Sequence, residues 1–176
     1  SQLSGSFSPF DITGPIDLEF VDLDIAGGDI RLPENAVMVS LDTLTSRGEI
    51  GLTTTRVVLA ADEFRTLRNS GDFDLVLDLS PEKWMKLDYV FSKADLSEFR
   101  PLAGANLTGR GTMLGKVEGN LDDLGLVADV DLRGFSAAGY PFADEVRSRI
   151  IGTENLKRFR FENLNMKRGE TVFTGP

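Results

Sequence analysis

The sequence contains no cysteine and no histidine. Without cysteine the chain can form neither a disulfide nor a thiolate metal site, and it has no thiol nucleophile. Without histidine it lacks the commonest metal ligand and general base of enzymes. These absences disfavour metal-centred and histidine-dependent catalysis.

Long apolar runs and positive charge are also scarce. No run approaches the roughly 18 apolar residues of a membrane span, and no signal peptide begins the chain. The 28 acidic residues outnumber the 19 basic ones, which gives a net charge of −9. This balance disfavours a nucleic-acid-binding surface, because phosphate binding depends on lysine and arginine.

What is present indicates a folded protein. The chain has 176 residues, of which 41% are hydrophobic and 27% are charged. This length suits one domain or one segment of an extended multi-unit protein. Both ends read as strands, so we expect a fragment of a longer, repeat-built protein, with any export signal or anchor outside it. Residues 1–94 and 95–176 are possible sub-units.

Alternation of apolar and polar residues with a period of two dominates the chain, as in strands with one polar face. The clearest segments are residues 16–20, 37–41, 50–52, 73–79 and 126–133. Glycine- and aspartate-rich pairs separate them, and Ser46-Arg47-Gly48 reads as one such turn. The pattern predicts a mostly β protein with eight to eleven strands in an antiparallel meander.

Helix signals are few and short. Helical spacing predicts helices over residues 61–69, 95–103 and 142–150, the last being the best supported because Phe142, Val146 and Ile150 are spaced four apart. Residues 84–91 fit a helix or a strand equally well, and the pattern leaves that segment open.

Two stretches of ten residues echo each other. Residues 20–29 and 161–170 share the pattern F-x-[DN]-L-[DN]-[IM]-x-x-G-[DE], and residues 41–49 give a shorter third copy. Each reads as a strand, a glycine turn and an acid that opens the next strand. Repetition of one hairpin unit suggests an elongated stack of strands.

The most informative segment is residues 106–121, NLTGRGTMLGKVEGNL. Every second position from Leu107 is apolar or glycine, and all but one of the others, Leu114, are polar. The apolar face of this strand carries four glycines, at Gly109, Gly111, Gly115 and Gly119. Such a sparse face indicates either a strongly curved or closely packed sheet, or an apolar trough for a ligand.

Other motifs are better explained by strands than by sites. The G-x-G-x-x-x-G spacing of residues 109–115 lacks the following helix that a dinucleotide site needs. Paired acids at residues 22/24, 72/74, 122/123 and 129/131 could bind calcium or act as glycosidase carboxylates, but most occupy the polar parity of strands. Charge is uneven, with residues 1–30 acidic and residues 147–168 basic.

The second half of the chain resembles the repeats of the TamB and AsmA-like family. The similarity lies in the short segment ADLSEFRPL at residues 94–102, in LTGRGTMLGKVEGNLDD at 107–123 and in LVADVDLRG at 126–134. Residues 161–166 with the following Phe173-Thr174-Gly175 also resemble the family's repeated strand pairs. Residues 1–94 share only its general strand pattern, and Asp122-Asp123 stands where the family often has proline.

The resemblance implies an elongated, curved antiparallel sheet that forms an open apolar groove, a β-taco-like fold, with a few short helices. Such proteins are periplasmic, are held in the inner membrane by an N-terminal helix, and function in outer-membrane biogenesis. As the inner-membrane component of a translocation and assembly module, they work with an outer-membrane barrel partner. They are thought to conduct phospholipids between membranes.

We therefore expect phospholipid acyl chains to lie along an apolar inner face, with no catalytic residue, cofactor or metal. The expected groove residues are Leu75, Leu77, Leu79, Met113, Val117, Val130, Leu132, Phe159 and Phe161, with the four glycines opening the groove. One alternative is a structural scaffold that docks an outer-membrane assembly partner through an exposed strand edge, without lipid. Another is a hydrolase that uses paired aspartates on polysaccharide.

Overall fold

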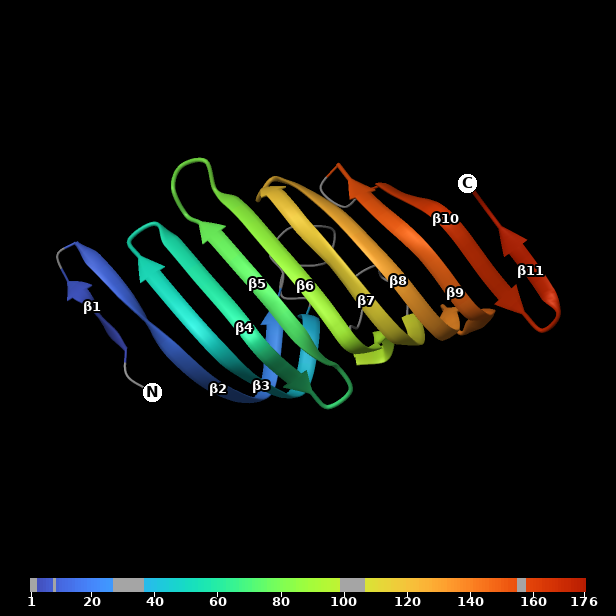
Figure 1. Ribbon diagram of the computed structural model, residues 1–176, viewed down its shortest axis with the longest axis horizontal. Coiled ribbons are helices and arrows are strands. Elements are labelled where there is room, and N and C mark those ends of the chain that lie inside the picture. Colours follow the sequence, from blue (N-terminus) through green and yellow to red (C-terminus); the bar gives the residue numbers. More distant parts are fainter. Residues whose placement is uncertain (1–2, 8, 27–36, 99–106, 155–157) are drawn as a thin grey trace.

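The computed structural model describes residues 3–7, 9–26, 37–98, 107–154 and 158–176. The elements are β1 (Ser4–Phe7), β2 (Phe10–Ala26), β3 (Val37–Thr53), β4 (Arg56–Thr66), β5 (Ser70–Asp78), β6 (Trp84–Asp95), the 3-10 turn η1 (Leu96–Glu98), β7 (Leu107–Asn120), β8 (Asp123–Ala137), β9 (Tyr140–Thr153), β10 (Arg158–Arg168) and β11 (Thr171–Thr174). The eleven strands form one sheet in chain order, each antiparallel to its neighbours (Figure 1). The predicted mostly β meander is confirmed.

The predicted helices over residues 61–69 and 142–150 are wrong. The first segment is the end of β4 and the turn after it, and the second lies inside β9. Residues spaced four apart share a face in a strand as well as in a helix, so the spacing of Phe142, Val146 and Ile150 could not separate the two. The open segment at residues 84–91 belongs to β6.

The predicted helix over residues 95–103 is also wrong in its described part, which contains only the single turn η1. Residues 99–103 lie outside the described residues. Residue 94, the boundary between the two possible sub-units, lies within β6, and β6 pairs with both β5 and β7.

The predicted turn at Ser46-Arg47-Gly48, and with it the hairpin reading of residues 41–49, is wrong because β3 runs through it. Gly48 is buried and pairs with Ala61 of β4. A Cβ built on Gly48 would lie 1.9 Å from the carbonyl oxygen of Ala60. This glycine therefore permits a close approach between two strands rather than a reversal of the chain.

Bulges interrupt the pairing of several strands, and together with interior glycines they bend the sheet. In β4, Asp62 and Glu63 together oppose the single residue Arg47, and in β6, Ser92 and Lys93 together oppose Thr112. Register shifts also occur where β8 pairs with β7 and where β10 pairs with β9. Bulges and interior glycines both increase the local bend and twist of a sheet.

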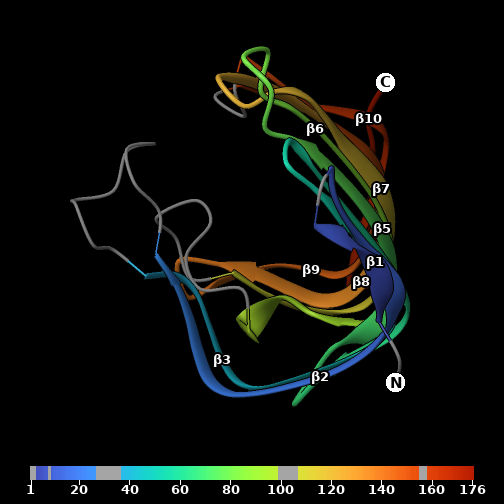
Figure 2. The same ribbon diagram turned by 90° about the vertical axis from the view of Figure 1, so that its left-hand side faces the viewer.

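Viewed along its long axis, the sheet is bent into an open trough (Figure 2). Burial shows which face lies inside. Leu132 and Ala94 are only 4% and 1% exposed, although every described strand belongs to this one sheet and none forms a layer over it. Their sequence neighbours on the other face, Arg133 and Lys93, are exposed. Side chains converge on the inner side of a curve, so the apolar face is the inner face.

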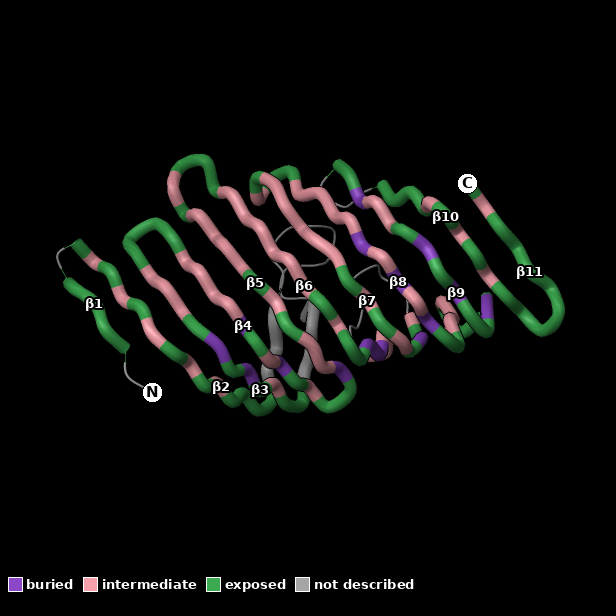
Figure 3. Tube along the Cα trace, viewed as in Figure 1, coloured by how far each residue is buried: buried purple, intermediate pink, exposed green. Residues whose placement is uncertain are grey.

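The core is correspondingly thin and lies along the middle strands. Both edge strands, β1 and β11, are exposed at every position, and the buried positions lie between them (Figure 3). The largest cluster of rings joins Phe64, Phe73, Tyr89 and Phe91 of β4, β5 and β6, with centroid separations of 5.1 to 5.8 Å. Two of these rings, Phe64 and Phe91, adjoin the bulges of β4 and β6.

Candidate functional site

The strand register places an unbroken apolar row across the inner face. Paired residues of neighbouring antiparallel strands lie on the same face. The row runs through Ile50, Leu59, Leu75, Leu87, Val117, Leu126, Gly152 and Phe159, one residue from each strand from β3 to β10. Adjacent rows carry Leu77, Met113, Val130, Leu132 and Phe161. The structure thus brings eight of the nine predicted groove residues onto one face.

The ninth residue, Leu79, lies outside the paired strands. It follows the end of β5, where its amide donates a hydrogen bond to the carbonyl of Thr55, and its side chain is 53% exposed. The alternation that predicted it continues past the end of the strand, because the sequence does not mark where pairing stops.

The predicted groove residues differ in how far they are exposed. Val130 and Leu132 are buried, whereas Met113 and Val117 are half-buried. Phe159 and Phe161 of β10 expose about half of their surface, at 50% and 51%. The inner face therefore presents accessible apolar surface, and among the eight predicted residues on it the two phenylalanines of β10 are the most exposed.

Three of the four glycines that were predicted to open the groove, Gly111, Gly115 and Gly119, lie where a neighbouring backbone approaches closely. A Cβ on Gly111 would lie 1.9 Å from the carbonyl oxygen of Asp131, and one on Gly119 would lie 2.4 Å from that of Asp123. At Gly109 a Cβ would make only ordinary contacts, the nearest with the Cα of Phe135 at 3.6 Å. Gly111 and Gly119 therefore permit close approach of the neighbouring strand, and the trough arises from curvature.

Gly115 is filled by an aromatic side chain as well as by backbone. Tyr89 is its cross-strand partner, and the tyrosine hydroxyl oxygen lies 2.8 Å from the position of a Cβ there. Burial raises the pKa of Tyr89 to about 12, because the charged phenolate is disfavoured away from water. The ring therefore lies over the glycine as part of the trough floor.

Sequence reasoning missed several inner-face residues. Leu87 and Phe91 would have followed from reading residues 84–91 as a strand, since they share the parity of Met85. Phe64 is harder to find, because the bulge at Asp62 and Glu63 shifts its parity relative to the start of β4. No local signal in the sequence marks that bulge.

The outer face of β8 carries one of the acid pairs, Asp129 and Asp131, with their basic partners on β9. Asp131 lies 2.9 Å from Arg147, and Asp129 lies 3.9 Å from Arg149. Across the described ranges, no three acidic residues gather as a metal site would require. None of the helical turns in those ranges is long and apolar enough to cross a membrane.

Comparison of the chain with protein-family models, with curated proteins and with solved structures gave no match.

Proposed function

We propose that this chain is a length of a periplasmic groove that conducts phospholipid between membranes, as the resemblance to the TamB and AsmA-like family implies. The observation that supports it most is the partly exposed apolar row on the inner face, which continues across strands from β3 to β10. Exposed apolar surface of this extent on a folded protein is typical of a binding site.

In this proposal the apolar inner face replaces water around the acyl chain. Each methylene group moved from water to the trough is stabilised by about 0.8 kcal/mol, so a chain can bind without any directed polar contact. The phosphate-bearing headgroup would stay at the open, wetter side. Such a site selects poorly between acyl chains and lets them slide, as a conduit requires. No side chain reacts.

Native mass spectrometry of the purified protein tests the proposal. We expect bound phospholipid that disappears on delipidation and returns when lipid is added. Met113→Arg or Val117→Arg should reduce occupancy by roughly tenfold or more, because the guanidinium would have to leave water beside the chain.

The matched control is Leu114→Arg, which places the same side chain one residue away, on the exposed outer face. This variant should retain lipid, and all three variants should keep their β content in circular dichroism. Equal occupancy in the inner-face and outer-face variants would exclude the trough as the lipid site.

A structural scaffold is the second candidate, and the edge strands favour it. All residues of β11 are exposed, including Val172 at 57% and Phe173 at 54%. An exposed edge can accept a strand from a partner. In that case Val172→Lys should abolish binding of an outer-membrane barrel partner, and Met113→Arg should leave that binding unchanged.

A further inference from the structure

A buried carboxylate organises the end of β6. The Asp95 side chain is only 7% exposed and lies 2.8 Å from the Nε atom of Arg110. It also accepts hydrogen bonds from the backbone amide of Ser97 at 3.0 Å and from the Ser97 hydroxyl at 2.6 Å. Burial acts to raise the pKa of Asp95, but these hydrogen bonds and Arg110 outweigh it and hold the pKa below its ordinary value.

A second arginine contacts Ser97, the residue that donates to Asp95. Arg68, in the turn between β4 and β5, donates from its Nη1 atom to the Ser97 hydroxyl at 2.8 Å. The turn is itself fixed by Asn69, which is 1% exposed and accepts a hydrogen bond from the Asp95 amide at 2.7 Å. Arg68 and Arg110 are therefore held near each other by one buried scaffold.

Both arginines keep donors available. Arg110 uses Nε for Asp95, its side chain is 79% exposed, and its two terminal nitrogens have no partner among the described residues. Arg68 likewise has a hydrogen bond from only one of its guanidinium nitrogens within those ranges. A guanidinium fixed on one side by a carboxylate presents its other N–H groups in a rigid geometry.

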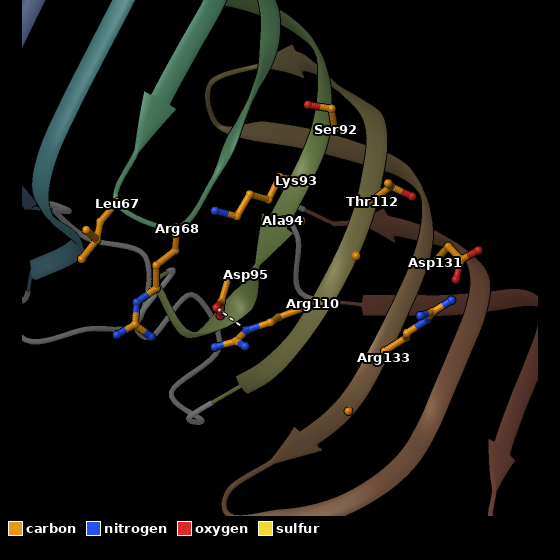
Figure 4. Close-up of a pocket in the computed structure, with 12 residues that line it drawn as sticks. Leu67, Arg68, Ser92, Lys93, Ala94, Asp95, Arg110, Thr112, Asp131 and Arg133 are labelled. Atoms are coloured by element: carbon orange, nitrogen blue, oxygen red, sulfur yellow. Dashed lines mark hydrogen bonds and ion pairs between the residues drawn. The ribbon is translucent and has the colours of Figure 1, made fainter.

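These groups border a hollow of about 1090 Å³ whose lining is cationic (Figure 4). Its charged side chains are Arg68, Lys93, Arg110, Arg133, Asp95 and Asp131, a surplus of two positive charges. Both acids are already in ion pairs, with Arg110 and Arg147 respectively. Lys93 extends from β6 toward the side on which Arg68 lies (Figure 4). In a chain with a net charge of −9, this is a local reversal of sign.

We propose that this hollow binds a phosphate-type oxyanion, which accepts hydrogen bonds from the terminal nitrogens of Arg68 and Arg110 and from the ammonium of Lys93. A tetrahedral anion with several charged oxygens suits donors that approach from three elements, and arginine pairs bind phosphate through parallel hydrogen bonds. The phosphate could belong to a soluble compound or to a lipid headgroup.

This inference does not depend on the proposed lipid groove. Lys93 opposes Thr112 on the outer face, whereas the acyl-chain site is carried by Met113 and Val117 on the inner face. Ala94 and Gly111 of the inner face also line the hollow, but Met113 and Val117 do not, and neither Arg68 nor Lys93 belongs to the apolar row. Variants at these residues therefore test the two proposals separately.

Calorimetric titration of the intact chain with inorganic phosphate, and with phosphatidylcholine vesicles with and without phosphatidic acid, tests the site. We expect Arg68→Gln and Lys93→Gln each to weaken phosphate binding by about tenfold, the loss of one charge-assisted contact. Arg149→Gln, which removes an outer-face arginine far along β9, should change it little.

Binding of inorganic phosphate without vesicle binding identifies a soluble ligand. Vesicle binding that needs phosphatidic acid and is weakened by Arg68→Gln identifies a headgroup. The proposal is overturned if neither probe binds the wild type, or if Arg149→Gln weakens binding as much as Arg68→Gln does.

Discussion

At the scale of single residues, the glycines of the inner face bring backbones together. Gly48, Gly71 and Gly111, on three alternate strands, each have the position of a Cβ 1.9 Å from a carbonyl oxygen of a neighbouring strand. Any side chain there must push two strands apart. The role of these glycines is therefore steric, and replacing one of them should change the free energy of unfolding.

Replacing Gly111 by alanine should lower the free energy of unfolding by about 1–3 kcal/mol, because the added methyl group overlaps the Asp131 carbonyl. Gly51 supplies the control, since its Cβ position has only ordinary contacts, at 3.7 and 3.8 Å. Gly51→Ala should leave stability unchanged or raise it by up to about 1 kcal/mol. Urea denaturation measures both, and equal losses would refute the steric account.

The buried Asp95 gives the protein a stability that depends on pH. Its pKa in the folded state is lowered, so its contribution is complete above the ordinary carboxyl pKa of about 4 and is lost as the pH falls below that value. Asp95→Asn should cost about 2 kcal/mol at pH 7, through the lost charged hydrogen bonds.

The difference in stability between wild type and Asp95→Asn should shrink as the pH falls from about 5 toward 3. Thermal denaturation over that range measures it. A difference that stayed constant with pH would mean that the carboxylate charge contributes nothing to the fold.

At the scale of elements, the sequence predicted the strands but not the bulges. Alternation located β5, β7 and β8 because their apolar residues keep one parity over most of their length. The bulge in β4 shifts that parity between Ala61 and Phe64, and the resulting spacing imitated a helix. A bulge is set by pairing with the neighbouring strand, so a single sequence does not reveal it.

The ring of Phe64 in β4 packs against rings of β5 and β6. Phe64 is 6% exposed, and its centroid lies 5.1 Å from that of Phe91 and 5.8 Å from that of Phe73. Phe64→Ala should lower the free energy of unfolding by about 3–4 kcal/mol. Phe161→Ala, on the same face but 51% exposed, should cost roughly 1 kcal/mol. If urea denaturation showed similar losses of unfolding free energy for the two variants, the rings around Phe64 would not form a packed core.

At the scale of the whole molecule, the face that carries the candidate site was predictable, but its shape was not. The parity of Met113, Val117 and Val130 is enough to place them together once strands pair in order. The sparse glycine face was interpreted partly as empty space, whereas the space belongs to the curve of the sheet. Curvature accumulates over many strands, and no single segment encodes it.

The length of the row distinguishes a conduit from a pocket. From Ile50 in β3 to Phe159 in β10 it crosses seven strand spacings, or about 34 Å at roughly 4.8 Å each. One acyl chain fills half of a hydrocarbon core of about 30 Å, so the row exceeds one chain by about twofold. A lipid that slides should therefore contact both ends of it.

Tryptophan quenching by lipids with brominated acyl chains can report those contacts. Trp84 is the only tryptophan, so a Trp84→Phe background permits single reporters at Ile50, Leu87 and Phe159 in the row. An outer-face reporter at Val90, which is 42% exposed and pairs with Leu114, is the control. A conduit quenches all three inner reporters and spares the outer one. Quenching at one inner position alone would identify a fixed pocket, and equal quenching at Val90 would remove the inner face from the lipid path.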